Sequence, residues 1–317
     1  MKCLVTGVAG FVGSHLAERL LRDGHSVVGV DALTDYYART LKQRNLQRLQ
    51  ENESFTFLEA DLNAIDLVTL IGESEWIFHQ AGQAGVRASW GQDFARYTAA
   101  NITATQHLLE AATHASRLKR FVYASSSSIY GNARALPVTE ETLPQPVSPY
   151  GVTKLAGEHL CMLYWHNYHV PTVALRYFTV YGPRQRPDMA FHKFLKAMLY
   201  EDEFTVYDDG YQTRDFTYVA DIAEANVQAA QAPDAAGQVF NIAGGSRVHL
   251  RKVIEIMEKL VGKPARIRYE PPALGDVRDT FADTTRAQHI LGYQPRVPLR
   301  EGLAAEIAFL RELYGCE

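Results

Sequence analysis

The sequence opens with M-K-C-L-V-T-G-V-A-G-F-V-G, residues 1–13. Residues 2–6 form a short apolar run that is typical of a buried strand, and Gly7, Gly10 and Gly13 follow it directly. Glycines between a strand and a helix let the backbone approach a pyrophosphate, and the helix N-terminus supplies free N–H donors. The spacing is G-x-x-G-x-x-G, which differs from the G-x-G-x-x-G of other dinucleotide sites. The stretch predicts a dinucleotide-binding turn; the alternative is that the glycines only close a tight turn.

From this turn onward, short β-branched runs alternate with helical patterns as far as residue 177. The expected strands are 2–6, 26–30, 55–58, 76–79, 121–124 and 173–176, and the expected helices are 11–22, 40–50, 97–115 and 149–168. This alternation predicts an α/β fold of the Rossmann type, a doubly wound parallel sheet with helices on both faces. The ligand crevice should lie along the carboxyl ends of the strands.

After residue 177 the regular alternation of strand and helix patterns ends, and the sequence is rich in residues typical of loops. Helices are expected at 191–200, 219–231, 250–261 and 300–314, and short strands at 205–207, 239–242 and 266–269. No linker separates the two parts. We therefore expect a dinucleotide-binding Rossmann domain over 1–177 and a smaller α/β lobe that covers the substrate over 178–317. The two should be closely associated, with some crossing of the chain between them.

Composition excludes several classes of protein. The 317 residues are 47% hydrophobic and 21% charged, and the net charge is −4 without a long basic run, which argues against nucleic-acid binding. No apolar stretch approaches the roughly 20 residues of a membrane span, and the N-terminus lacks a signal-peptide pattern. The three cysteines, Cys3, Cys161 and Cys316, are far apart and odd in number, so we expect no disulfide framework, no metal site and a cytoplasmic location.

Further cofactor contacts follow from the strand ends. Asp31 ends the second strand, where a carboxylate suits the ribose hydroxyls and would repel a 2′-phosphate, which favours NAD over NADP. Asp61 and Leu62, after the third strand, should lie near the adenine. The remaining residues expected at the cofactor lie in the glycine turn and in the small-residue run after His79: Phe11, Val12, Gln80, Ala81 and Ala84.

The segment S-P-Y-G-V-T-K, residues 148–154, carries the predicted catalytic chemistry. Tyr150 and Lys154 are four residues apart, so they share one face of a helix. A nearby ammonium and the positive nicotinamide ring would favour the phenolate and make Tyr150 a base. A hydroxyl from the serine run at 125–128 would complete a proton relay for oxidising an alcohol. The alternatives are an exposed Tyr–Lys pair and an ordinary serine-rich loop.

With these motifs, the chain resembles the extended short-chain dehydrogenase/reductases, in particular the nucleotide-sugar epimerases. In that family, tightly held NAD oxidises the sugar, the keto intermediate turns, and hydride returns to its opposite face. The resemblance implies that Tyr150 is the base, that Lys154 is its partner and a ribose contact, and that Ser126 is catalytic. It also implies that Tyr177 closes on the nicotinamide side and that Asn101 braces the site.

In the second lobe, the resemblance suggests residues that hold the nucleotide. Tyr207 matches an aromatic residue that stacks near uracil, and Arg214 matches an arginine that meets the diphosphate. Asp276, in G-D-V-R-D-T-F-A-D, should reach the uridine ribose. Arg278 in the same segment has no certain counterpart; contact with the diphosphate is our working hypothesis.

Three segments favour a uronic acid as the sugar. A-G-Q-A-G-V-R, ending at Arg87, and D-A-L-T-D-Y-Y, residues 31–37, resemble segments of uronate 4-epimerases. F-T-V-Y-G-P-R-Q-R places Thr179 where neutral-sugar epimerases have asparagine, and it adds Arg184 and Arg186. Hydroxyls and a guanidinium fork hold carboxylates well, so Thr179 and Arg186 are candidates for that role, assisted by Ser127 or Ser128. A surface ion pair or a diphosphate clamp is the alternative for the arginines.

The serine run also bears on the outcome of the reaction. Related decarboxylases and 4,6-dehydratases carry acidic residues where this chain has Ser127 and Ser128, which cannot act as carboxylic acids. We therefore expect inversion of UDP-glucuronate to UDP-galacturonate through a 4-keto intermediate, without decarboxylation. The alternatives are a 4-epimerase of UDP-glucose or UDP-N-acetylglucosamine, then a UDP-glucuronate decarboxylase, and, from another class, an NAD-sensing binding protein. A homodimer through helices 97–115 and 149–168 is expected, unless those helices simply pack on the sheet.

Overall fold

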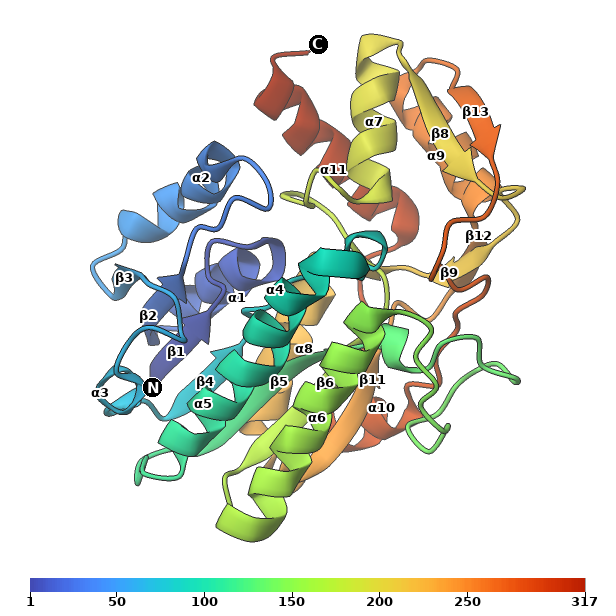
Figure 1. The fold of residues 1–317 in the computed structure, drawn as a ribbon. Coiled ribbons are helices and arrows are strands. Elements are labelled where there is room, and N and C mark those ends of the chain that lie inside the picture. Colours follow the sequence, from blue (N-terminus) through green and yellow to red (C-terminus); the bar gives the residue numbers. More distant parts are fainter. Residues whose placement is uncertain (317) are drawn as a thin grey trace.

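A seven-stranded, fully parallel sheet forms the centre of the molecule (Figure 1). The computed structural model describes residues 1–316. The strands run in the order β11-β6-β5-β4-β1-β2-β3. Their bounds are β1 Lys2–Thr6, β2 Ser26–Asp31, β3 Phe55–Glu59, β4 Trp76–His79, β5 Arg120–Ser126, β6 Thr172–Tyr177 and β11 Gln238–Ile242. Strand order reverses between β1 and β4, which is where a doubly wound sheet opens its ligand crevice.

Helices cover both faces of this sheet. One hydrophobic core joins the sheet to α1 (Phe11–Arg22), α2 (Arg39–Gln50), α8 (Val219–Gln231) and α10 (Thr285–Leu291). The other joins it to α3 (Leu67–Ile71), α5 (Ala104–Ala112) and α6 (Pro149–Tyr168). The predicted Rossmann-type sheet is therefore confirmed.

A second, smaller layer lies beyond the carboxyl ends of the strands, at the upper right of Figure 1. It contains α7 (Ala190–Tyr200), α9 (Leu250–Val261), α11 (Leu299–Tyr314), β8 (Glu203–Tyr207) and β13 (Arg266–Glu270), and it has its own apolar core. Short strands complete it: β7 Val180–Tyr181, β9 Thr213–Asp215, β10 Thr217–Tyr218 and β12 Arg247–His249. Strand β11 and helix α8 lie in the 178–317 segment but pack with the main sheet. The division at residue 177 remains a prediction.

The expected helix over 97–115 differs from the structure. A helix, α4, begins earlier, at Phe94, and ends at Thr98, and a π-helical turn, Ala99–Thr103, separates it from α5. Within this turn the Thr105 hydroxyl donates to the carbonyl oxygen of Asn101 at 2.8 Å. Residues 113–115 leave the helix, where the Thr113 hydroxyl bonds the carbonyl of Glu110. A wide turn of this kind has no distinct apolar periodicity, and such turns are frequent at functional sites.

Candidate active site

The glycine turn connects the end of β1 to the start of α1. Gly7 has φ +68°, and a Cβ at this position would lie 2.7 Å from the backbone nitrogen of Ala81, which follows β4. A Cβ at Gly13 would collide with the carbonyl oxygen of Gly7. Gly10 is the N-cap of α1 and provides no side-chain cap, so the first N–H groups of this 12-residue helix lack a side-chain acceptor. The turn is a cradle that only glycine fits, beside a helix N-terminus.

Asp31 lies beside this turn at the end of β2. Its carboxylate accepts the N–H groups of Ala9 (3.1 Å) and Leu33 (2.8 Å). Burial raises the pKa of Asp31, and the two N–H bonds and Lys42 partly offset the effect. A carboxylate held by two backbone donors is fixed in place and keeps unused lone pairs for hydroxyl groups.

Tyr150 and Ser126 meet at the carboxyl edge of the sheet. Tyr150 is in the first turn of α6, which begins with Ser148 as N-cap, its hydroxyl accepting the N–H of Gly151 at 3.1 Å. Burial raises the pKa of Tyr150, whereas a hydrogen bond with Ser126 and the charge of Arg186 lower it. The guanidinium of Arg186 is therefore a further cation that favours the phenolate, in addition to the lysine ammonium and the nicotinamide ring expected from the sequence.

Lys154 lies one helical turn further along α6 and is almost fully buried. Its Nζ atom is 4.5 Å from the centre of the Tyr123 ring. Burial lowers the pKa of Lys154 to about 8, and the nearby Cys161 and Glu158 partly counteract this shift. A lysine with this pKa is mostly protonated at neutral pH and loses its charge in the mildly alkaline range.

Asn101 braces the segment that crosses the site. Its Oδ1 accepts the N–H of Gln83 at 2.7 Å, and its Nδ2 donates to the carbonyl of Gln83 and to the hydroxyl of Thr153, both at 2.9 Å. Thr153 is next to Lys154 in α6. The Asn101 amide, presented by the π-helical turn, thus ties the loop after β4 to the catalytic helix.

Tyr177, at the end of β6, has its hydroxyl in a cluster of amides. It is within hydrogen-bond distance of the Gln80 amide (3.1 Å) and of the Asn226 amide nitrogen (2.7 Å). Burial raises the pKa of Tyr177. The hydroxyl therefore stays protonated and links β6 to the loop after β4.

Arg186 contacts a carboxylate of its own chain, and its charge lowers the pKa of Tyr150. Its Nε and Nη2 donate to Oδ1 and Oδ2 of Asp188, each at 3.0 Å, and Asp188 also accepts the hydroxyl of Tyr36 at 3.2 Å. Tyr97 packs edge-on against Tyr150, with ring centres 6.3 Å apart, and donates to the carbonyls of residues 84 and 85. Arg186 is thus part of the wall around the predicted base.

The residues expected at the nucleotide end also come together. The Arg87 guanidinium lies 3.9 Å from the centre of the Tyr207 ring and donates to Asp276 at 2.6 Å. Arg214 donates to the carbonyls of Val277 (2.5 Å) and Arg278 (2.8 Å). Arg87 therefore contacts the two residues expected to hold uracil and ribose.

Two other arginines point elsewhere. Arg278 pairs with Asp208 at 2.6 Å and Asp209 at 3.0 Å, and half of its side chain is exposed. Arg184 donates to Glu18 of α1 at 2.6 Å. These contacts match the alternative of structural ion pairs. Contact of Arg278 with the diphosphate stays a prediction.

The other predicted site residues lie on the same edge of the sheet or next to it. Phe11 and Leu62 are buried; Val12, Ala81, Ala84, Ser127, Ser128 and Thr179 are partly buried; and Asp61 is exposed. The backbone N–H of Ser128 donates to the Ser126 hydroxyl at 3.2 Å, so Ser126 also ends β5 as a cap.

Sequence reasoning missed a buried ion pair behind the catalytic residues. Glu158 accepts from the Arg176 guanidinium at 2.6 Å and from the Ser125 hydroxyl at 2.6 Å, and both charged side chains are almost fully buried. Glu158 follows Tyr150 by eight residues and Lys154 by four, so the helical stripe was visible in the sequence. The pair joins β5, β6 and α6 beneath the site.

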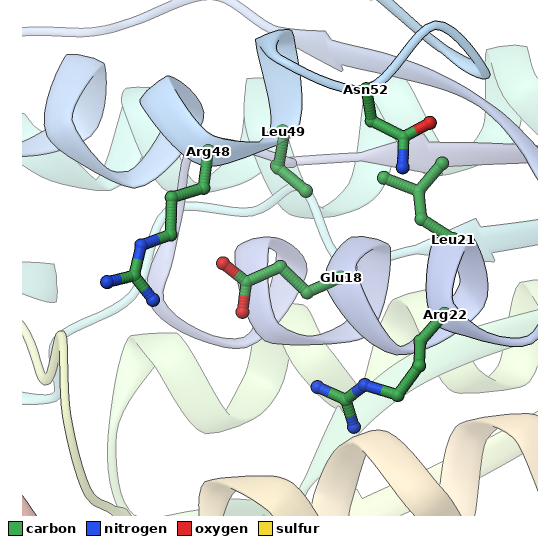
Figure 2. Close-up of a pocket in the computed structure, with 6 residues that line it drawn as sticks. All are labelled: Glu18, Leu21, Arg22, Arg48, Leu49 and Asn52. Atoms are coloured by element: carbon green, nitrogen blue, oxygen red, sulfur yellow. The ribbon is translucent and has the colours of Figure 1, made fainter.

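Other features of the described chain carry no predicted chemistry. A shallow depression over α1 and α2 is lined by Glu18, Leu21, Arg22, Arg48, Leu49 and Asn52 (Figure 2), none of which was expected at the site. Residues 1–316 contain no group of three or more His, Cys, Asp or Glu side chains placed to hold a metal. In the same residues, helices of the length and apolarity needed for a membrane span are absent.

Comparison with known proteins finds relatives over nearly the whole chain. Residues 3–243 match the sequence model of the NAD dependent epimerase/dehydratase family. An uncharacterized UDP-glucose epimerase of Bacillus subtilis, YtcB, is 44% identical, with 99% of each chain aligned. The UDP-glucuronate 4-epimerase of Thermodesulfobacterium geofontis is 38% identical over 98% of this chain and 96% of its own.

A solved structure resembles the whole molecule. It is the UDP-glucuronic acid 4-epimerase of Bacillus cereus in complex with UDP-glucuronic acid and NAD. The TM-score is 0.96, the identity is 45%, and the alignment covers 99% of this chain and all of the other.

Proposed function

This chain belongs to the NAD dependent epimerase/dehydratase family, and from that premise we propose that it inverts carbon 4 of UDP-glucuronate. The product is UDP-galacturonate, formed through a transient 4-keto sugar with the carboxylate retained. The observation that carries the proposal is the meeting of Tyr150, Ser126 and Arg186 at the carboxyl edge of a dinucleotide-type sheet.

The site fits NAD as the resident cofactor. At Gly7 and Gly13 a Cβ would collide with the chain's own backbone, so the turn is tight and its surface is bare of side chains, and the start of α1 offers N–H groups to a pyrophosphate. Asp31 would take the adenosine ribose hydroxyls and disfavour a 2′-phosphate. When bound, NAD supplies reversible hydride acceptance at carbon 4, so no net redox change results.

The protein's own residues handle the proton. Tyr150 would remove the hydroxyl proton at carbon 4 and later return it, with the Ser126 hydroxyl hydrogen-bonded to the same phenol. Lys154, protonated at neutral pH, contributes a positive charge in the next turn of the helix. The Asn101 braces keep the loop after β4 in position against this helix.

The carboxylate would be held by Arg186 with Thr179, because the charge of Arg186 acts on Tyr150, whereas Arg87 contacts Tyr207 and Asp276 at the nucleotide end and Arg184 pairs with Glu18 of α1. Oxidation at carbon 4 makes a β-keto acid, which loses carbon dioxide readily when the carboxylate is free to rotate. Ser127 and Ser128 provide hydroxyls at positions where an acidic residue would favour decarboxylation or dehydration of the sugar. A sugar carboxylate that is held by an arginine, with no carboxylic acid next to it, should remain on the sugar.

A UDP-glucose 4-epimerase is the second candidate, favoured by the name of the Bacillus subtilis relative. The presence of a cationic side chain beside the base distinguishes the two. A neutral hexose gives Arg186 no ionic partner, whereas a uronate does.

We also infer a homodimer through α4, α5 and α6. The outer surface of α6 exposes Val152 (47%) and Leu163 (52%), which are eleven residues, or about three helical turns, apart and therefore lie on one side of the helix. Exposed apolar patches of this kind mark contact surfaces. The three free cysteines support a reducing compartment such as the cytoplasm.

The deciding experiment uses the purified protein without added NAD, incubated separately with UDP-glucuronate and UDP-glucose. Products are resolved by anion-exchange chromatography. UDP-galacturonate without a UDP-pentose would support the proposal and a retained cofactor. Conversion of UDP-glucose alone would move the assignment to the neutral-sugar epimerases, and a UDP-pentose would show decarboxylation.

A further inference from the structure

The guanidinium of Arg186 is only half used by its own chain. A guanidinium presents two forks, one made by Nε with Nη2 and one by Nη1 with Nη2. Asp188 occupies the first fork with two bonds of 3.0 Å. Within residues 1–316, Nη1 has no hydrogen-bond partner, and the side chain is 20% exposed. The second fork is therefore left unpaired by residues 1–316.

Asp188 is itself fixed by the other part of the molecule. The hydroxyl of Tyr36, in the loop after β2, donates to its Oδ2 at 3.2 Å. Tyr36 has little freedom, because its hydroxyl lies against Gly85, where a Cβ would collide with it. Tyr36 therefore bonds Asp188, and Asp188 bonds Arg186. These contacts connect the loop after β2 to the second lobe.

We propose that Asp188, braced by Tyr36, is a positioning residue that presents the open fork of Arg186 to the carboxylate of the sugar. This inference rests on the proposed function. The proposal explains why Arg186 is already paired with a carboxylate of its own chain. Asp188 occupies one fork of the guanidinium and thereby fixes the orientation of the other fork, which is free to bind the sugar carboxylate. An unbraced arginine would lose rotamer freedom when the substrate binds, and the affinity for a uronate would fall.

Two substitutions separate alignment from charge. Asp188→Asn removes the negative charge and one of the two oxygens that accept from Arg186. Tyr36→Phe keeps every charge and removes only the hydrogen bond from the Tyr36 hydroxyl to Asp188. Affinities for UDP-glucuronate and UDP-glucose are measured by calorimetry in a Tyr150→Phe background, which prevents turnover. We expect Asp188→Asn to weaken UDP-glucuronate binding about tenfold and Tyr36→Phe about threefold, with UDP-glucose changed less than twofold.

Steady-state kinetics in the otherwise unchanged enzyme give a second readout. KM for UDP-glucuronate should rise in both variants while kcat stays within about threefold, since the base and its relay are intact. Arg186→Ala sets the upper limit of the effect. Glu312→Gln is the matched control, because this carboxylate also pairs with an arginine, Arg44 at 2.7 Å, but lies 71% exposed on α11.

The opposite pattern would overturn the inference. If Asp188 only masks the charge of Arg186, Asp188→Asn would bind UDP-glucuronate more tightly than the parent and Tyr36→Phe would be unchanged. Equal loss for both sugars would indicate a general structural role and would also contradict it. Failure of the proposed function is distinguishable, because the parent enzyme would then give no UDP-galacturonate at all.

Discussion

The proposed chemistry depends on the side chain of Tyr150. Its hydroxyl is shielded from water, which raises its pKa, and Ser126 and Arg186 act in the opposite direction. A phenol in this balance is a weak base until the positive nicotinamide arrives beside it. The free site is therefore poised for proton transfer only with its cofactor.

Replacing Tyr150 with phenylalanine removes the proton acceptor and keeps the ring. Turnover of UDP-glucuronate should fall at least 10²-fold, because a positioned general base contributes about 10²–10⁴. Bound NAD, measured by absorbance after denaturation, should stay at the wild-type level. Tyr168→Phe, at the exposed end of the same helix, is the control. Turnover near that of wild type would show that Tyr150 is not the base.

The pKa of Lys154 leads to opposite pH dependences for activity and stability. Because burial lowers it from 10.5 to about 8, Lys154 is charged in both folded and unfolded chains below pH 8, and burying that charge costs stability there. Between pH 8 and 10.5 the unfolded chain binds the proton and the folded chain does not, so stability due to Lys154 rises with pH. Activity should fall over the same range as the positive charge near Tyr150 is lost.

Thermal unfolding and kcat profiles of wild type and Lys154→Met from pH 7 to 10.5 test this pair of trends. The melting temperature of wild type should rise relative to Lys154→Met as the pH increases above about 8. A constant difference between the two proteins would mean that Lys154 titrates normally.

At the scale of elements, α6 shows why much of the fold was predictable. Its bounds, Pro149–Tyr168, follow from local signals, namely the Ser148 cap, the proline in the first turn and a left-handed residue at His169. The glycine turn and strand ends are local in the same way. The π-helical turn at 99–103 is not local, because Asn101 there bonds to Gln83 and Thr153 from two other elements.

The same distinction separates the site residues that were found from those that were missed. Motif positions such as Tyr150 and Lys154 share a helix, so their spacing alone places them together. The partners Asp188 for Arg186 and Asp276 for Arg87 depend on side-chain directions in loops, which no period describes. Sequence could name the arginines but could not say which carboxylate each would meet.

The Asn101 brace gives a prediction at this scale. Asn101→Asp keeps the shape and the acceptor but places a carboxylate against the carbonyl of Gln83, which loses its donor. We expect a loss of about 1–3 kcal/mol in stability and a weaker hold on NAD, since the loop after β4 is released. Chemical denaturation and NAD content after gel filtration measure the two effects. Asn167→Asp also loses a donor to a carbonyl, that of Leu163, but at the exposed end of α6, so it should lower stability less and leave the NAD content unchanged. An unaltered Asn101→Asp protein would disprove the brace.

At the scale of the whole molecule, the active site is assembled from both parts of the chain. Arg184 of the second lobe pairs with Glu18 of α1, and Asp188 bonds Tyr36 from the loop after β2. Strand β11 and helix α8 return to the main sheet after the second lobe has begun. The lobe is therefore anchored at several points around the crevice, and the sugar-binding residues stay in register with the cofactor turn.

The inferred dimer is the prediction that concerns the whole assembly. An arginine at Leu163 on α6 would place a charge in an apolar interface, where it finds no water and no partner, so the dimer should dissociate. Sedimentation velocity at micromolar concentration should then show a monomer for Leu163→Arg and a dimer for wild type. Leu58→Arg, on edge strand β3 at the opposite side of the sheet, makes the same exchange at a 40% exposed leucine and should remain dimeric. If wild type sediments as a monomer, the apolar stripe on α6 has another role; if both variants stay dimeric, the interface lies elsewhere.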